Sequence, residues 1–237
     1  MKRREWFQKA AAAFGLTGVS ARLRAAAESD PESDSEKSPD CVLTPSQTAG
    51  PFYFNPKQFR KDITEKREGV PLLLKLEIVR VSQCEPVPGA WVEIWHTDPR
   101  GVYSGYARQG DRGRIDARGE DFLRGIQVAD KNGQVEFETL FPGWYRGRLT
   151  HIHFKVHLDE RTVVTSQLYF PEKIVKEIYA LEPYKARGQN PTDERRDGVL
   201  RRDDLKKLRV SAQKNDLKKN PKLPKNGYNA SHIIGIA

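Results

Sequence analysis

The 237-residue chain has only two cysteines and five histidines, and it contains no long hydrophobic run. Two cysteines are too few for a cysteine-rich zinc site. No apolar stretch approaches the roughly 20 residues that a membrane-spanning helix needs, so we expect no membrane span. The chain also shows no internal repeat, and its length fits one domain with a substantial core.

The formal net charge is +9, but it is unevenly distributed. Residues 1–27 contain six Lys or Arg residues against one Glu, which is more than half of the excess positive charge. The remaining excess is spread along a C-terminal third in which few aromatic residues accompany the Lys and Arg residues. This pattern favours a solvated basic surface over a nucleic-acid groove, so no nucleic-acid partner is expected.

The N-terminus has the organisation of an export signal. Arg3 and Arg4 precede two bulky aromatic residues, an apolar run covers Ala10 to Ser20, and Ala25 to Ala27 offers a small-residue cleavage site. Residues 1–27 therefore predict a twin-arginine signal peptide and a periplasmic or secreted protein. The alternative is an amphipathic N-terminal helix on a cytoplasmic protein.

Residues 28–40 are polar and acidic and include two prolines. A segment of this composition cannot bury a core, so it predicts a disordered linker that precedes a folded domain at residues 41–237. In an exported protein the pair Cys41 and Cys84 predicts a disulfide. The alternative, a metal-binding or nucleophilic cysteine, lacks a Cys-x-x-Cys pair or a nearby histidine.

The domain reads as a series of short strands separated by Gly, Pro and Asn turns. Apolar, alternating or β-branched runs predict strands at residues 72–81, 90–96, 125–129, 134–140, 163–170 and 228–236, with a further strand beginning at His151. Asn132 and Gly133 predict a hairpin turn over residues 130–133. Residues 172–225 are charged, with a helical stretch at 172–180. We predict a mainly β protein, an antiparallel β-sandwich with long loops and a short C-terminal helical excursion.

Three of the five histidines lie within seven residues. His151 and His153 point to the same face of a strand, because strand side chains alternate. Their imidazoles can bind one metal ion, and zinc, copper and iron all accept this donor. The alternative is an ordinary strand that contains histidines. His157 lies roughly 13 Å beyond His153 and is expected to be peripheral. His96 is expected in the core or behind the site, and His232 indicates no function.

Two tyrosines stand where further ligands are needed. Tyr103 and Tyr145 each follow a turn at the end of a strand, whereas no Asp or Glu lies immediately around the histidine pair. Tyrosine has a pKa of about 10, so its ionisation near neutral pH requires a strong local cation such as a ferric ion. Two phenolates with two imidazoles would stabilise Fe(III), a centre suited to activating an organic substrate.

The chain resembles the intradiol ring-cleavage dioxygenases, which include catechol 1,2-dioxygenase and protocatechuate 3,4-dioxygenase, and among them the exported single-domain members. The matching motifs lie in the family's order at residues 43–45, 50–53, 88–98, 101–106, 122–127, 142–145 and 151–154. This resemblance implies a mononuclear non-haem Fe(III) bound by Tyr103, Tyr145, His151 and His153. It also implies cleavage of a catechol by O2 to a cis,cis-muconate-type product, with Tyr145 displaced by the substrate.

The resemblance also points to residues around the iron. Arg148 stands where the family carries an arginine near the reacting carbon, and it could stabilise developing negative charge; the alternative is a surface arginine. Gln167 matches a family position near the site, or else it pairs with a strand neighbour. Tyr106 lines the substrate pocket or caps a turn. Only five residues separate Tyr145 from His151, fewer than in the well-known bacterial enzymes, which leaves the identity of the catechol open.

Two other functions compete with the dioxygenase. Similar sandwiches serve as non-catalytic binding modules, since fold does not fix function, and a zinc-dependent hydrolase would also use the histidines. The Tyr and His quartet favours the dioxygenase, because a binding module has no need of all four residues. A homo-oligomer is possible.

Overall fold

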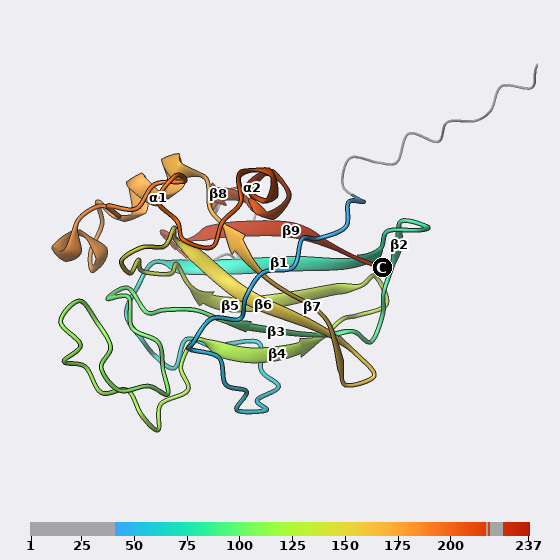
Figure 1. The fold of residues 1–237 in the computed structure, drawn as a ribbon, viewed down its shortest axis with the longest axis horizontal. Coiled ribbons are helices and arrows are strands. Elements are labelled where there is room, and N and C mark those ends of the chain that lie inside the picture. Colours follow the sequence, from blue (N-terminus) through green and yellow to red (C-terminus); the bar gives the residue numbers. More distant parts are fainter. Residues whose placement is uncertain (1–40, 217, 219–224) are drawn as a thin grey trace, which may run out of the picture. The chain divides into compact units, whose positions relative to one another are not determined.

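The computed structural model describes residues 41–216, 218 and 225–237. The predicted signal peptide at 1–27 and the predicted linker at 28–40 lie outside the described residues. Within the described part, the chain forms two β-sheets that pack face to face, with short helices in the C-terminal third (Figure 1). The predicted mainly β sandwich is therefore confirmed.

The first sheet is mixed. Strand β1 (Pro71–Arg80) pairs antiparallel with β5 (Gln134–Leu140) and β2 (Glu85–Pro86) along one edge, and parallel with β9 (Tyr228–Ile236) along the other. Strand β8 (Ser211–Lys214) completes the order beyond β9. The parallel pair departs from the all-antiparallel prediction. A parallel pair needs a long connection between its strands, and the long C-terminal excursion returns the chain to the end of the sheet at which β1 begins.

The second sheet is antiparallel and carries the histidines. Its order is β4 (Arg124–Val128), β3 (Trp91–Trp95), β6 (His151–Leu158) and β7 (Arg161–Tyr169). The core lies between the sheets, where Ile152, Phe154 and Val156 of β6 are fully buried. Because strand side chains alternate, His151 and His153 project from the opposite, outer face of this sheet.

The predicted hairpin at residues 130–133 is wrong. The turn itself forms, since the Gly133 amide donates to the Asp130 carbonyl at 2.9 Å and Gly133 has a φ of +71°. Its flanking strands, however, pair with different partners, β4 with β3 and β5 with β1. Local turn chemistry reverses the chain but does not choose the partner. Here the turn carries the chain from one sheet to the other, so that both strands bury an apolar face in the core.

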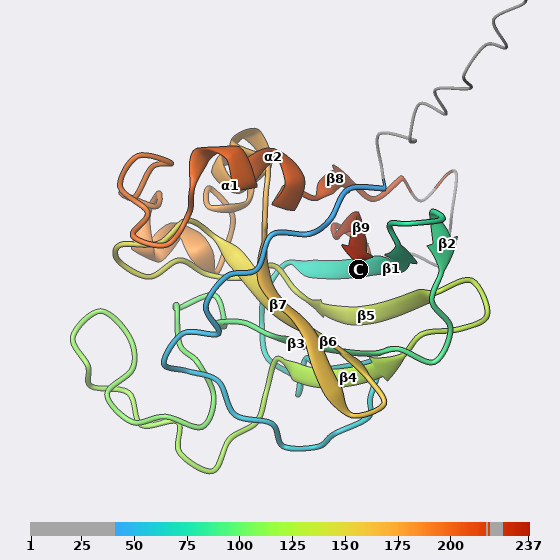
Figure 2. The same ribbon diagram turned by 45° about the vertical axis from the view of Figure 1, so that its right-hand side comes forward.

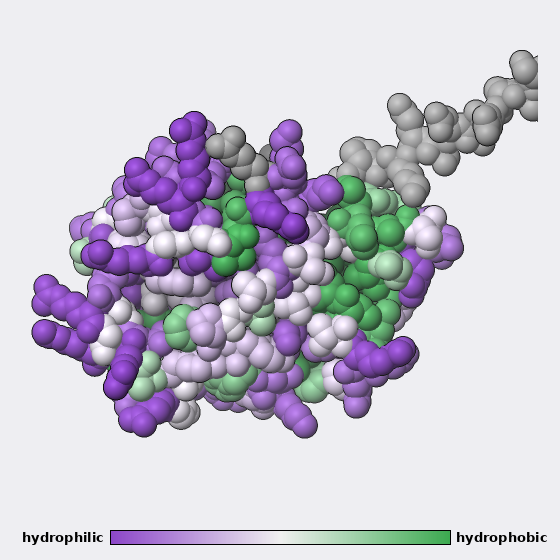
Figure 3. Space-filling model, in the orientation of Figure 1, coloured by the Kyte–Doolittle hydropathy of each residue, from purple (hydrophilic) through white to green (hydrophobic). Residues whose placement is uncertain are grey.

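The C-terminal excursion contains α1 (Glu172–Ile178), a 3-10 helix (Tyr184–Arg187) and α2 (Arg202–Leu208). Both ribbon views place these helices together on one side of the sheets (Figures 1 and 2). Ile178 and Tyr184 join the main core, and Leu205 and Leu208 pack against Tyr169 of β7. The surface here is largely hydrophilic in Figure 3, as its many Lys and Arg residues require. None of the helices in the described residues has the length and apolar character needed to cross a membrane.

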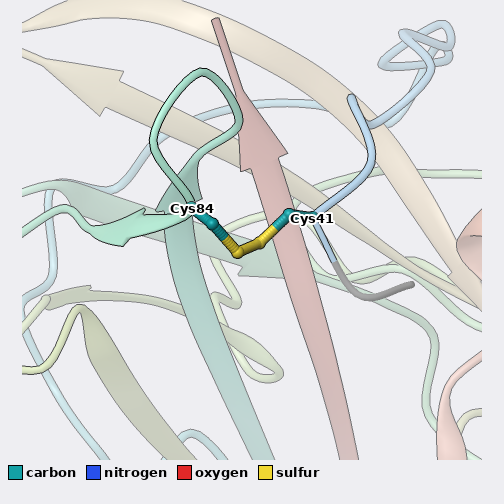
Figure 4. Close-up of a disulfide and its surroundings, with 2 residues drawn as sticks. All are labelled: Cys41 and Cys84. Carbon is teal, nitrogen blue, oxygen red and sulfur yellow. A yellow bond between two sulfur atoms is a disulfide. The ribbon is translucent and has the colours of Figure 1, made fainter. Parts of the chain in front are cut away.

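Residues 41–60, which we call the N-terminal strap, connect the two sheets. The strap forms a bridge at Leu43 to Gly235 of β9, and a second at Phe59 to Ile126 of β4. Between these points it crosses the outer face of the second sheet. Its first residue is fixed by the predicted disulfide, Cys41–Cys84, with the two Cα atoms 5.6 Å apart (Figure 4). The bond joins the strap to the hairpin between β1 and β2.

Candidate metal centre

Two glycines bring the two tyrosine-bearing loops together. Tyr103 lies in the long connection between β3 and β4, and Tyr145 in the segment between β5 and β6. A Cβ atom at Gly143 would collide with the Asp98 carbonyl oxygen, and a Cβ at Gly101, where φ is +73°, would collide with the Trp144 carbonyl oxygen. The absence of a side chain at both positions allows the loops to pack backbone against backbone.

The polar atoms of all four predicted ligands converge. The Nε2 atom of His151 lies 3.1 Å from Nε2 of His153, 3.2 Å from the Tyr145 hydroxyl and 3.4 Å from the Tyr103 hydroxyl. Tyr103, His151 and His153 are at most 3% exposed, whereas Tyr145 is partly exposed. The described residues contain no cluster of three His, Cys, Asp or Glu side chains that suits a metal. The donor set is therefore two phenols and two imidazoles.

The electrostatics keep these four groups neutral until a cation is present. Burial raises the pKa of Tyr103 well above its usual value, the nearby Tyr145 raises it further, and burial also raises the pKa of Tyr145. Burial lowers the pKa of His151 and of His153, and the charge of Arg148 lowers both further. A bound trivalent cation would offset this cost by favouring the phenolates over the phenols.

Backbone and ring contacts orient the two imidazoles. The Nδ1 of His151 donates to the Leu149 carbonyl, which leaves the lone pair of Nε2 directed at the other donors. The ring of His153 stacks on Trp95, with centroids 4.8 Å apart and planes 5° from parallel. Its Nδ1 is buried and has no hydrogen-bond partner among the described residues. A hard cation between two phenolates and two neutral imidazole nitrogens fits this donor set.

Arg148 is not a surface arginine. Its side chain is 11% exposed, and its Nε donates to Asp197 at 3.0 Å. Its Nη2 donates to the Gln167 side-chain oxygen and, at 3.2 Å, to the Tyr169 hydroxyl. Gln167 is opposite His153 in the sheet and donates through Nε2 to the Thr48 carbonyl at 3.0 Å. Both ends of the Gln167 amide are thus used within the protein, and Gln167 links Arg148 to the strap.

Tyr106, a predicted pocket residue, packs behind the site. Its hydroxyl donates to the Tyr53 carbonyl at 2.7 Å, and its ring meets the edge of Phe52 at 5.3 Å. Tyr106 lines neither of the cavities beside the tyrosines. It therefore contacts the strap at Phe52 and Tyr53.

The other histidines lie apart from the four donors. His96 is fully buried and hydrogen-bonded to Thr139 and to the Thr97 carbonyl, as its expected core position requires. His157 lies 3.4 Å from Glu93 and also contacts Thr162. His232 lies on β9 of the first sheet.

Two cavities lie beside the tyrosines. One of about 440 Å³ is lined by Tyr145, Arg146, Arg148 and Val199 together with strap residues 48 and 50–52. The other, about 250 Å³, is lined by Tyr103, Tyr145 and Phe52 among other residues. Phe52 stacks on Tyr103 with centroids 4.9 Å apart and so forms a wall common to both cavities. Tyr145 is the donor that borders both.

Sequence reasoning did not assign three residues of this site. Phe52 had an available signal, because it lies in the matching motif at residues 50–53. Trp95 also lies within a matching motif, at residues 88–98. Asp197 had none, because it is one of several acidic residues in a charged segment.

Comparisons with known proteins agree with this geometry. A family model described as Dioxygenase matches residues 49–180, more than half of the chain, and includes all four donors. Chlorocatechol 1,2-dioxygenase of Pseudomonas sp. strain P51 is 30% identical over 118 residues, which cover 42% of this chain and 43% of that protein. Catechol 1,2-dioxygenase 1 of Acinetobacter lwoffii is 28% identical over 147 residues, covering 52% and 45%. The chain spans less than half the length of these curated relatives.

Among solved structures, the chain is similar over a larger share to an intradiol ring-cleavage dioxygenase from Tetranychus urticae. That similarity has a TM-score of 0.72 and 31% identity, and covers 83% of this chain and 95% of the other. The dioxygenase domain of a carbohydrate-binding fusion protein from Streptomyces sp. SirexAA-E has a TM-score of 0.55 at 24% identity, covers 83% of this chain, and shows the fold alone.

Proposed function

Because this chain belongs to the intradiol ring-cleavage dioxygenase family, we propose that it cleaves a catechol-type ring with O2 between the two hydroxylated carbons. The ring-opened product would be of the cis,cis-muconate type. Tyr103, Tyr145, His151 and His153 would hold one ferric ion. The observation that carries the proposal is the convergence of their polar atoms, since those of the other three residues all lie within 3.4 Å of His151 Nε2.

Bound there, the ferric ion would supply the Lewis acidity that favours catecholate over catechol and makes the ring reactive toward O2. The protein residues have separate tasks. Tyr145 is the donor that borders both cavities, so its phenolate oxygen is the one placed to accept a proton from an entering catechol. Phe52 offers a flat wall for the ring, and Arg148 supplies positive charge where negative charge develops.

Export is also part of the proposal. The disulfide between Cys41 and Cys84 supports it, because disulfides persist in oxidising compartments and are rare in the cytosol. The predicted twin-arginine signal is consistent with this, since that route carries folded proteins. N-terminal sequencing of protein recovered from the periplasm or medium tests the location, and a start at Met1 would contradict cleavage.

The activity is tested by O2 uptake against a panel of catechol, protocatechuate, hydroxyquinol and chlorinated catechols, with protein loaded with Fe(III). We expect one of them to give a ring-opened diacid that carries both atoms of labelled O2. Loading should also produce a visible tyrosinate band, which a zinc hydrolase would not show. Protein that stays colourless and inactive after iron loading would contradict the proposal.

The ligands are tested by single substitutions. Tyr103→Phe and Tyr145→Phe should each shift or abolish the visible band, because each removes a phenolate from the ferric ion. His157→Gln is the matched control, since His157 contacts Glu93 and Thr162 instead of the four donors. It should retain the band. An unchanged spectrum in either tyrosine variant would refute that ligand.

A further inference from the structure

Asp197 is a fully buried carboxylate that reaches the site from the C-terminal excursion. It lies in the connection between the 3-10 helix and α2, beyond residues 49–180 to which the family model applies. Its side chain has no exposed surface, and its carboxylate accepts hydrogen bonds from Arg148 Nε at 3.0 and 3.1 Å. The main-chain amides of Leu149, Val199 and Leu200 donate to it at 2.7, 2.8 and 2.9 Å.

These contacts join two separate segments. The Leu149 amide and the Arg148 side chain belong to the short loop between Tyr145 and His151, whereas Val199 and Leu200 belong to the excursion. Burial alone would raise the pKa of Asp197, but the amide of Leu149 and the charge of Arg148 outweigh it and hold the pKa below its usual value. The group is therefore an ionised anchor for the loop.

Asp197 also helps to fix the orientation of the Arg148 guanidinium. Nε is held by Asp197, and Nη2 by Gln167 and Tyr169. The guanidinium also faces Tyr145, because the charge of Arg148 and a side-chain hydrogen bond from it act to lower the pKa of Tyr145 against the effect of burial. Arg148 lines the cavity of about 440 Å³ beside Tyr145, and Val199, two residues after Asp197, lines the same cavity. The planar guanidinium, fixed at two nitrogens, is thus held beside Tyr145 at the wall of this cavity.

We propose that Asp197 is a positioning residue that holds Arg148 toward the substrate cavity, so that the C-terminal excursion is a working part of the site. This inference rests on the proposed function. It requires that the effect of Asp197 on turnover passes through Arg148. If Asp197 only anchored the loop, replacing it would lower turnover equally whether or not Arg148 is present.

The test is a double-mutant cycle on iron-loaded full-length protein. Asp197→Asn keeps the shape of the side chain but removes its charge, and it should lower kcat by about tenfold to a hundredfold with KM changed less than about threefold. In an Arg148→Gln background the same substitution should change kcat by less than about twofold. Equal effects of Asp197→Asn in both backgrounds would overturn the inference.

The matched control is Asp204→Asn. Asp204 is also a buried aspartate of the excursion that is paired with an arginine, since it lies 3.0 Å from Nε of Arg201, but it lines neither cavity. It should leave kcat unchanged. Asp197→Glu keeps the carboxylate and serves as the second variant if Asp197→Asn does not fold. Asp197→Glu should have a higher kcat than Asp197→Asn. If Asp197→Asn does not fold, Asp197→Glu should have a higher kcat than Asp197→Ala.

A readout independent of turnover separates this inference from the proposed function. Modification of Arg148 by phenylglyoxal, followed by peptide mass spectrometry, should be slow in the wild-type protein and in Asp204→Asn. It should be at least about fivefold faster when Asp197 loses its charge, because the guanidinium is then released. A wild-type protein inactive on every catechol would overturn the proposed function alone. An unchanged rate at Arg148 in the charge-free variant would overturn the positioning role.

Discussion

At the scale of single residues, His96 makes the stability of the fold sensitive to acid. Its Nδ1 donates to the Thr97 carbonyl at 3.0 Å, so its Nε2 accepts from the Thr139 hydroxyl at 2.8 Å, and burial lowers its pKa to about 4. An unfolded histidine has a pKa of about 6.5. Between these values the unfolded chain binds a proton that the folded chain does not, so the free energy of unfolding falls as the pH falls from about 6.5 to 4.

The first prediction is that this histidine accounts for a loss of about 3 kcal/mol between pH 7 and pH 4. Urea unfolding across this range measures the slope of stability against pH. His96→Gln should reduce that slope by about 1.4 kcal/mol per pH unit near pH 5, because one proton fewer is taken up on unfolding. The half-buried His232, whose pKa is also lowered to about 4, stays in the variant and keeps part of the slope. Equal slopes in both proteins would contradict the prediction.

A second prediction concerns the glycine that lets the two tyrosine loops meet. Gly143→Ala should destabilise the fold by about 1–3 kcal/mol, because the added methyl group collides with the Asp98 and Pro99 carbonyl oxygens. It should also weaken iron binding by moving Tyr145 away from Tyr103. Gly198→Ala is the matched control, since a Cβ at Gly198 meets nothing within 4 Å. Thermal unfolding and iron titration measure both effects, and equal behaviour of the two variants would count against this account.

At the scale of elements, the strap is held at one end by a covalent bond and carries part of the site. The disulfide joins residues 43 positions apart, and Thr48, Gly50 and Phe52 follow it along the strap. A crosslink of this span restricts the unfolded chain and stabilises a protein by about 2–4 kcal/mol. Since the strap also bonds to Thr165 of β7 and to Gly235 of β9, it stays in place in part when the bond is cut.

The third prediction is that Cys41→Ser with Cys84→Ser lowers the free energy of unfolding by about 2–4 kcal/mol but leaves the protein folded. Denaturant unfolding of the double variant measures this, with wild-type protein in reductant as the comparison. The reduced wild type should match the double variant. If reduction had no effect on the stability of the wild type, the crosslink would not have the role that the structure gives it.

The strands that the sequence predicted share one property, an apolar or alternating run of residues. Strand β6 alternates strictly between polar and apolar residues, and β9, predicted at residues 228–236, is rich in Ile and ends in an apolar run. Strand β8 and helix α2 were not predicted. Helix α2 is highly charged, and β8 is a short polar segment. β8 is a strand because it pairs with β9, so its structure depends on a tertiary contact that local propensity does not report. The hairpin predicted at residues 130–133 was wrong for the same reason, because the pairing of the flanking strands is also set by tertiary contacts.

At the scale of the whole molecule, the site is assembled from segments that no local pattern connects. The four proposed ligands could be named from residue types and from the resemblance to a family, because phenol and imidazole donors have a specific chemistry, and the structure brings their polar atoms together. The residues that surround these four could not be identified in this way. Asp197 lies 49 positions after Arg148, and only the path of the excursion brings its carboxylate to the guanidinium. Partners of this kind follow from three-dimensional packing, which the sequence encodes without a motif.

The last prediction follows from the place of β9 in this assembly. Strand β9 is bonded to β1 over nine residues on one side and to β8 on the other, and Ala230, Ile234 and Ile236 belong to the core. Removing residues 228–237 would leave β1 with an open edge, separate β8 from the sheet and expose core side chains of the opposite sheet to water. Such a loss exceeds the 5–15 kcal/mol by which domains are usually stable.

We therefore expect the shortened chain to show no cooperative thermal unfolding and to bind no iron, although all four proposed ligands are still present. Removing Ala237 alone is the control, because this residue is exposed and lies beyond the end of β9. That variant should unfold cooperatively, as the full chain does. If the chain without residues 228–237 folded and retained the tyrosinate band, the second sheet and its loops would form the site by themselves. The mixed first sheet would then have no part in supporting the centre.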